Sequence, residues 1–305
     1  MTSYRIKAYI YLTIVAVIWG VATPVIKYTL QGITPLSFLT YRFAISSVVA
    51  VVLIFFSRDK LSKIFDNFWE ATLYSFITTT FALGILFFGI EKTTVLDAAL
   101  ITAVGPLVIA LAGVYLLKEH ITHREKLGIT LAFTGTLVTV LEPILSGNFN
   151  TSQLSGNLFV VAYIFITAAS SVLSKKLVRK DVDPLTLTNY SFIIGFVTLI
   201  PLALVEGSFS NIIVNIESLT PSYHLGVWYM AILSGTTAYA LWVRGQKSIE
   251  ISEAGLFAYL TPLFSTPLAV LWLDEQITAP FIVGAILITL GVVTAEYKKR
   301  AIDRK

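Results

Sequence analysis

Residues 98–135 read AALITAVGPLVIALAGVYLLKEHITHREKLGITLAFTG, and residues 254–291 read AGLFAYLTPLFSTPLAVLWLDEQITAPFIVGAILITLG, the same pattern 156 positions later. Each copy is an apolar run broken by a proline, then an acidic turn, then a second apolar run with glycines seven residues apart. A repeat of this length indicates a duplicated architecture. We therefore expect two related halves, residues 1–148 and residues 149–305.

The composition is that of a membrane protein. Hydrophobic residues make up 56% of the 305 residues, charged residues 13%, and the mean hydropathy is +0.80. Soluble proteins carry about 25% charged residues. The charges fall in short breaks between apolar runs of about 20 residues, the length that crosses a bilayer. We expect an all-α polytopic membrane protein with ten spans, near residues 8–30, 34–56, 70–90, 95–117, 124–142, 156–176, 184–205, 223–244, 252–273 and 277–296.

Lysine and arginine predict the orientation of these spans, because cytoplasmic loops are enriched in both. If the N-terminus is cytoplasmic, the segments on that side carry 19 of the 22 basic residues. The start of the chain lacks a signal-peptide cleavage pattern, so we interpret it as an uncleaved first span. We expect a multi-pass protein of the plasma (inner) membrane with both termini in the cytoplasm.

The second half is expected to be inverted relative to the first, because five spans are an odd number. The similarity extends to the second span of each half, where Tyr41 and Phe43 align with Tyr190 and Phe192 at a shift of 149. Inverted repeats are typical of secondary transporters, in which the substrate site lies near the bilayer midplane between the halves.

Several short motifs occur in a fixed order along the chain. They are Trp19-Gly20 followed by Lys27, Tyr41-Arg42-Phe43, Phe87-Phe88-Gly89-Ile90-Glu91 followed by Ala98-Ala99-Leu100, Pro106, and an acid, Glu119 or Glu275, before a glycine-bearing helix. In this order and in duplicate, they resemble the drug/metabolite transporter superfamily and, within it, the EamA-type exporters with ten helices. The resemblance implies a basket-like bundle around a central cavity, lined by the first, third and fourth helices and by the sixth, eighth and ninth. Members of that family move amino acids, other small metabolites and sometimes drugs, usually outward.

Polar and aromatic side chains within these spans are the candidates for substrate binding. They are Trp19, Thr23, Arg42, Thr78, Thr79, Thr102, Ser170, Thr237, Tyr239, Tyr259 and Ser265. Arg42 lies about 12 Å into its span. A charge at the bilayer centre costs at least ~2.5–3.5 kcal/mol, so such residues face a cavity or a partner. Arg42 has a functional interpretation, as the receptor for a carboxylate, and a structural one, as an interfacial anchor or a contact with helix carbonyls, and both stay open. The hydroxyl groups likewise suit either a wet cavity or packing between helices.

Three prolines within the spans are predicted hinges: Pro106, Pro262 and Pro267. Pro106 and Pro262 occupy equivalent positions in the two copies. A proline breaks the helical ladder and frees the carbonyl four residues back. These carbonyls could bind a substrate ammonium, but neighbouring helices commonly satisfy such groups in membranes, so we favour a kink or hinge.

The residue types and motifs that the sequence lacks exclude several classes of function. The chain has no cysteine, and its three histidines lie in loops or at helix ends. HExxH, GxSxG and phosphate-binding glycine motifs are absent, so we expect no enzyme, no cofactor, no metal site and no nucleic-acid partner. No Asp or Glu lies centrally in a span, and proton relays in membranes normally need one. Protons therefore have no visible carrier, and antiport of cationic drugs is disfavoured.

The sequence predicts a secondary transporter that exports small metabolites by alternating access, with amino acids or related zwitterionic or neutral solutes as cargo. A facilitative carrier or a multidrug exporter of the same fold is the alternative, followed by a lipid-handling enzyme or a scaffold. The expected partners are the solute and the lipid bilayer, with the protein a monomer or weak dimer. We interpret Glu119 and Glu275 as structural acids, because a carboxylate near a helix start is favoured by the helix dipole.

Overall fold

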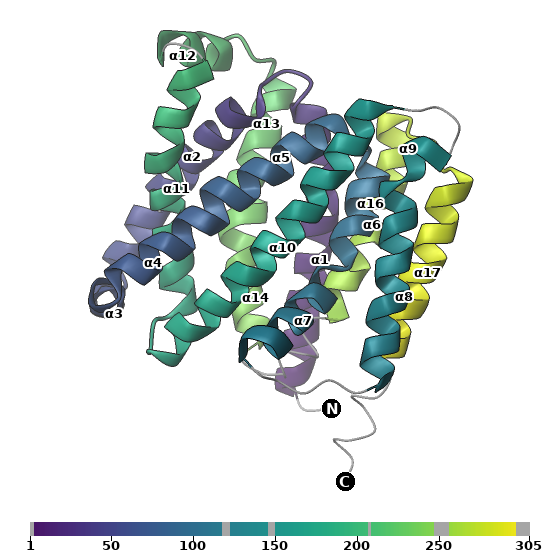
Figure 1. The fold of residues 1–305 in the computed structure, drawn as a ribbon. Helices are drawn as coiled ribbons and strands as arrows, with labels where there is room; N and C mark the ends of the chain where they lie inside the picture. Colours follow the sequence, from purple (N-terminus) through teal and green to yellow (C-terminus); the bar gives the residue numbers. More distant parts are fainter. Residues whose placement is uncertain (1–2, 118–122, 146–149, 207–208, 247–255, 297–305) are drawn as a thin grey trace.

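The structure is a computed structural model, and it describes residues 3–117, 123–145, 150–206, 209–246 and 256–296. Every element within these ranges is a helix (Figure 1). Among the described residues, six helices are long and apolar enough to cross a membrane, and shorter apolar helices lie at Lys126–Val140, Phe257–Leu273 and Ala279–Ala295. The prediction of an all-α polytopic membrane protein is confirmed.

The first half forms five helical runs, some of them interrupted. They are α1 (Ser3–Thr29), α2 (Pro35–Phe55), α4–η2–α5 (Phe68–Ser75, Phe76–Ala82, Leu83–Lys92), α6–α7 (Val95–Ala103, Gly105–Leu117) and α8 (His123–Val140). Three short elements connect them: η1 (Arg58–Lys60), α3 (Leu61–Asp66) and α9 (Glu142–Leu145).

The second half repeats this order. Its runs are α10 (Thr151–Arg179), α11 (Pro184–Glu206), α13–η3–α14 (Pro221–Trp228, Tyr229–Thr237, Ala238–Gln246), η4–α16 (Leu256–Leu260, Thr261–Leu273) and α17 (Ala279–Glu296). A short helix, α12 (Phe209–Glu217), precedes α13. The boundary expected between residues 148 and 149 lies outside the described residues.

Side-chain caps explain where several helices begin. The Thr34 hydroxyl accepts a hydrogen bond from the Ser37 N–H at 3.4 Å, and Pro35 occupies the first turn of α2. The Asn150 side chain caps α10 in the same way. A capping side chain satisfies backbone donors that have no partner inside the helix, and proline is tolerated there because that position needs no N–H.

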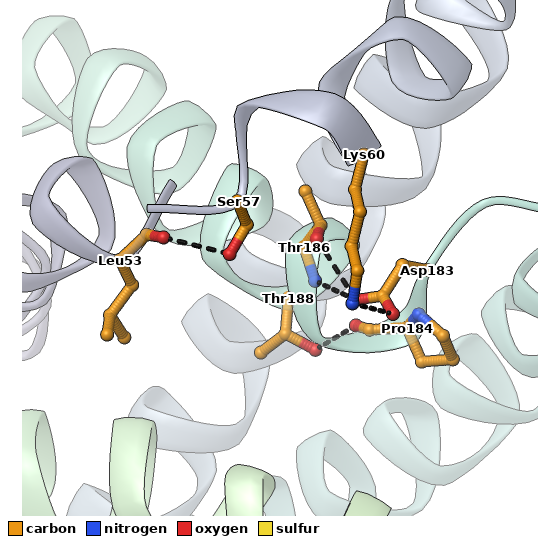
Figure 2. Close-up of polar contacts among 7 residues, drawn as sticks. All are labelled: Leu53, Ser57, Lys60, Asp183, Pro184, Thr186 and Thr188. Atoms are coloured by element: carbon orange, nitrogen blue, oxygen red, sulfur yellow. Dashed lines mark hydrogen bonds and ion pairs between the residues drawn. The ribbon is translucent and has the colours of Figure 1, made fainter. Parts of the chain in front are cut away.

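Asp183 caps α11 and also ties the two halves together (Figure 2). Its carboxylate accepts hydrogen bonds from the N–H and the hydroxyl of Thr186, each at 3.0 Å, and an ion pair from Lys60 at 2.9 Å. Desolvation opposes the charged form, but these hydrogen bonds outweigh it and hold the pKa of Asp183 below its usual value of 3.8.

Asp183→Ala is expected to lower the stability of the protein by about 1 kcal/mol, the typical cost of a lost N-cap. A group with a lowered pKa stabilises the fold above its unfolded-state pKa, and that contribution is lost as the pH falls through the lowered value. The difference in melting temperature between wild type and variant should therefore persist at neutral pH and shrink in strong acid. Asp66→Ala, which breaks only an exposed 3.8 Å pair with Lys63, is the control and should change little. Equal effects of the two substitutions would contradict the capping role.

Helices α8 and α17 cross at the paired glycines of the repeat, and they lie side by side at one edge of the bundle (Figure 1). A Cβ atom added to Gly128 would lie 2.5 Å from the carbonyl oxygen of Gly291. One added to Gly135 would lie 2.8 Å from the carbonyl oxygen of Gly284. The early glycine of each helix thus faces the late glycine of the other, so the helices are antiparallel and the contact is self-complementary, as a two-fold axis requires.

The other contacts between the halves obey the same symmetry. Helix α1 packs along α14 and α16, and its counterpart α10 packs along α5 and α7. Helix α2 packs along its own counterpart, α11, where the rings of Phe43 and Phe192 lie 5.9 Å apart. Since these two phenylalanines are equivalent by sequence, they meet close to the axis. These contacts are the ones that the predicted inverted arrangement of the two halves requires.

Candidate functional site

The third run of each half contains a π-helical segment, η2 in the first and η3 in the second. When residue numbers in the first half are shifted by 156, η2 aligns with most of η3 in the sequence. A π-helix widens the turn and is frequent at functional sites. In η3, the carbonyl oxygen of Ser234 accepts a hydrogen bond from the indole N–H of Trp19 at 3.2 Å, and that of Ala231 accepts one from the Ser46 hydroxyl at 3.3 Å. Carbonyls of this segment thus bind helices of the opposite half.

The fourth run of each half breaks at one equivalent position. Val104 separates α6 from α7, with φ −80° and ψ −11°, and Leu260 precedes α16 with φ −79° and ψ −15°. The predicted hinges Pro106 and Pro262 follow two residues later in each copy. Pro267 lies inside α16 and is exposed. The breaks are observed, and movement about them stays a prediction.

Arg42 is buried in the middle of the bundle, with 4% of its surface exposed. Its guanidinium carbon lies 5.3 Å from the centre of the Phe43 ring and 6.0 Å from that of Phe87. It also interacts electrostatically with the phenol groups of Tyr163 and Tyr239, which belong to the second half. Cation–π contacts of this kind offset part of the cost of a buried charge.

Trp19 and Tyr239 extend this cluster. The Trp19 ring lies 5.5 Å from that of Tyr239 and 5.3 Å from that of Trp242, and Tyr239 lies 6.2 Å from Phe192. We call Trp19, Arg42, Phe43, Phe87, Tyr163, Phe192 and Tyr239 the central cluster. Tyr163 was not among the candidates expected from the sequence. The feature that could have pointed to it is the presence of a tyrosine within the sixth span.

The remaining candidates divide into two groups. Buried hydroxyls bond to their own helix: Thr79 to Ser75 at 2.7 Å, Ser170 to Thr167 at 2.9 Å and Ser265 to Pro262 at 3.4 Å. Half-buried candidates lie on the inner helices: Thr23, Thr78, Thr102, Thr237 and Tyr259. Thr102 also bonds its own helix, at the Ala98 carbonyl. Thr79 packs against Gly195 of α11, so it lies in a helix–helix contact.

At the end of the bundle where α1 finishes, Lys27 and Glu275 bind backbone groups of the first half. The Lys27 amine donates to the carbonyl oxygens of Ile90, Glu91 and Thr93 at 3.0, 2.8 and 2.6 Å, so its three donors are engaged. The Glu275 carboxylate accepts from the N–H groups of Val95 and Leu96 at 2.6 and 2.9 Å.

Glu275 therefore stabilises the start of α6, a helix of the other half, and not the start of its own helix α17. Thr278 caps α17, with its hydroxyl accepting from the Phe281 N–H at 3.3 Å. Burial raises the pKa of the Glu275 carboxyl above its usual 4.5, although the two backbone donors lower it in part. Its counterpart Glu119 lies outside the described residues.

Two carboxylates near the same end are more buried than the sequence suggested. Asp97 and Glu142 are 2% and 5% exposed. The Gln153 side-chain amide donates to both, at 2.9 and 2.7 Å, and the Asn157 amide donates to Asp97 at 3.0 Å. Both amides belong to the second half, at i and i+4 on α10, so this polar network also joins the halves.

Two hollows in the described part of the chain are lined by residues outside the central cluster. One of about 270 Å³ lies beside Lys27, Lys92, Gln153 and Glu275. The other, about 510 Å³, is an apolar groove along α17 between Ile277 and Leu290. The central cavity implied by the resemblance therefore stays a prediction.

Comparison with known proteins links the chain to membrane transporters. The model of the EamA-like transporter family matches residues 6–141 and 154–295. A Bacillus subtilis protein named uncharacterized transporter YyaM is 29% identical, over 95% of this chain and 94% of its own. An Escherichia coli K12 protein named probable amino-acid metabolite efflux pump is 24% identical, over 92% and 91%. A crystal structure of a protein with 19% identity, covering 97% of this chain and 98% of its own, matches with a TM-score of 0.67 and so shares the fold.

Proposed function

Because the chain belongs to the EamA-like transporter family, we propose that it is a secondary transporter that exports small metabolites by alternating access. As a member of that family it is a membrane transporter, which implies a small-molecule solute and a lipid environment. Amino acids or related zwitterionic or neutral solutes are the proposed cargo. The similarity to the Escherichia coli protein named an amino-acid metabolite efflux pump supports that choice.

The observation that carries the proposal is the position of the interrupted helices. In a transporter made of two inverted halves, exchanging the conformations of the halves exposes one central site to either side in turn. The first helix of each half packs against the interrupted third and fourth runs of the other half: α1 against η3 and α16, α10 against η2 and α7. If the two halves move relative to each other, the helices would bend at these interrupted segments, where the backbone hydrogen-bonding pattern of the α-helix is broken.

The proposed location is the plasma membrane, with both termini in the cytoplasm. Helix α1 begins and α17 ends at the same end of the bundle (Figure 1). The basic residues Lys60, Lys63 and Lys180 lie in connections that the orientation places on the cytoplasmic side, as the positive-inside rule expects.

A flux assay tests the transport activity. The purified chain is reconstituted in liposomes loaded with an amino acid, and exchange of labelled external amino acid is followed. We expect exchange for at least one amino acid. Uphill accumulation driven by an imposed pH gradient would indicate proton coupling, and exchange without it would indicate a facilitative carrier. Flux of cationic dyes alone would favour the multidrug alternative, and no flux of any solute would contradict the proposal.

Thr237→Trp is expected to block this exchange while leaving the protein folded. Thr237 is half-buried at the end of η3, two residues before Tyr239 of the central cluster, and the proposal places it on the solute path, which an indole there would obstruct. Thr289→Trp on the exposed face of α17 is the matched control and should transport normally. Undiminished exchange by Thr237→Trp would remove this residue from the path.

A further inference from the structure

Arg42 carries a charge that the protein does not neutralise. It is 4% exposed, and its Nε atom has no hydrogen-bond partner. Among the described residues, no carboxylate forms an ion pair with it. Asp97 is bound to Gln153 and Asn157, and Glu275 to backbone N–H groups. Buried charges are normally paired, so an orphaned guanidinium needs an explanation.

The symmetry of the fold argues against a purely structural role. The residue equivalent to Arg42 in the second half is Ser191, between Tyr190 and Phe192. The Ser191 hydroxyl forms a neutral hydrogen bond with that of Ser75 at 2.9 Å. The same packing position is therefore filled in the other copy without a charge.

The surroundings of Arg42 offer further groups for a polar ligand. The phenol group of Tyr239 interacts electrostatically with the guanidinium. Tyr163 and Tyr239 are half-buried, so the cluster is not a sealed core. The rings of Phe43 and Phe87, 5.3 and 6.0 Å from the guanidinium carbon, supply apolar surface. Cation, hydroxyl and apolar rings come from both halves.

We propose that Arg42 is the receptor for a carboxylate of the transported solute, with the Tyr239 hydroxyl as a second donor to it. This inference rests on the proposed transport function and names the chemical class of its solute. A guanidinium presents two parallel N–H donors that match the two oxygens of a carboxylate, and it does so best in a water-poor site. Binding then completes the ion pair that the empty protein lacks.

The proposal predicts that solutes bind only if they carry a carboxylate. Amino acids and monocarboxylates bind, whereas amino-acid amides and simple amines do not, because they bring no negative charge to Arg42. The remainder of the solute contacts the aromatic rings of the central cluster.

The test is a thermal-shift titration of the purified full chain with L-amino acids, the matching L-amino-acid amides, lactate and pyruvate. A ligand that binds the folded state raises its melting temperature. We expect carboxylates to stabilise the wild type and amides to have no effect. Arg42→Met should abolish this stabilisation. Arg42→Lys keeps the charge but not the two parallel N–H donors of the guanidinium, and it should weaken binding about 10- to 100-fold. Ser191→Ala, at the equivalent position, is the control and should respond like the wild type.

The stability of the unliganded Arg42→Met variant is a second readout. Removing an unpaired buried charge should raise its melting temperature, whereas loss of a structural contact would lower it. A lower value, equal stabilisation by amides, or carboxylate binding retained in Arg42→Met would overturn the proposal. So would the absence of stabilisation by every carboxylate tested. Amino-acid flux through the wild type that survives in Arg42→Met would overturn this inference while leaving the transport function intact.

Discussion

Gly128→Leu is expected to yield no folded protein, and Gly128→Ala a protein destabilised by about 1–3 kcal/mol, the usual cost of overpacking. The reason is the glycine crossing between α8 and α17. A Cβ atom at Gly128 meets the backbone of α17, 2.5 Å from the Gly291 carbonyl oxygen and 2.5 Å from the Ala295 nitrogen. Backbone atoms cannot rotate away as a side chain does, so the helices must separate. Small residues at membrane helix contacts permit this close approach.

A matched glycine makes the experiment specific. Gly84 is also buried within a helix, but a Cβ atom there meets nothing within 4 Å. Gly84→Ala should leave the fold intact and raise its stability by up to about 1 kcal/mol, the gain in helix propensity. The measurement is the yield of monodisperse protein and its melting temperature in detergent. Equal behaviour of Gly128→Ala and Gly84→Ala would refute the close contact. By symmetry, Gly291→Ala should reproduce the defect of Gly128→Ala.

Asn157→Leu is expected to be the other strongly destabilising substitution, although leucine has a similar size and suits a lipid environment. Asn157 is fully buried, and its amide donates to the carboxylate of Asp97 at 3.0 Å and to the carbonyl oxygens of Thr139 and Val140, each at 3.3 Å. Its own oxygen accepts a hydrogen bond from the Thr93 hydroxyl. Each buried polar group left without a partner costs about 1–3 kcal/mol, and more when it is charged.

A double-mutant cycle assigns the effect to the network. Asp97→Leu combined with Asn157→Leu should be less destabilising than the sum of the two single substitutions, because neither partner is then left stranded. Asn215→Leu, in exposed α12, is the control and should change stability by less than about 0.5 kcal/mol. Additive effects of Asp97→Leu and Asn157→Leu would show that the two side chains act independently.

The plan of the helices could be predicted from the sequence because its signals are local. Residues 34–56 and 184–205 were expected as spans, and the structure places α2 at Pro35–Phe55 and α11 at Pro184–Glu206. The glycines seven residues apart in the repeat lie at the α8–α17 crossing, a contact that was not predicted from the sequence. Hydrophobic runs, helix caps and a duplicated pattern can be recognised in the order of the residues alone. Helices predicted from them therefore need no knowledge of the tertiary structure.

The π-helical segments could not be predicted in this way. Which of Thr78, Thr79 and Thr80 faces inward depends on the helical register, and a π turn shifts the angular position of every residue in it. Thr79 consequently packs against Gly195, and Thr80 bonds Thr198 of α11, while Thr78 stays half-buried. A period of 3.6 residues does not resolve these three neighbours.

Burial of Asp97 depended on partners that are remote in sequence. Its position near the end of a span predicted a carboxylate in the interface region. The amides that hold it, Gln153 and Asn157, lie 56 and 60 residues further along the chain. Tyr163 was not predicted as a candidate for the same reason, because only the packing of the second half against the first brings it close to Arg42. Contacts between the halves are where the sequence alone was least informative.

Lys27 and Glu275 bind only main-chain atoms of residues 90–96, whatever side chains those residues carry. The attachment therefore places almost no demand on the identity of the segment that it holds. The exposed residues Glu91 and Lys92 can therefore change without loss of these hydrogen bonds, whereas either anchoring side chain is hard to replace. A library that randomises Glu91 and Lys92 together with Lys27 and Glu275 should recover many different residues at the first two positions and almost always the same two anchors.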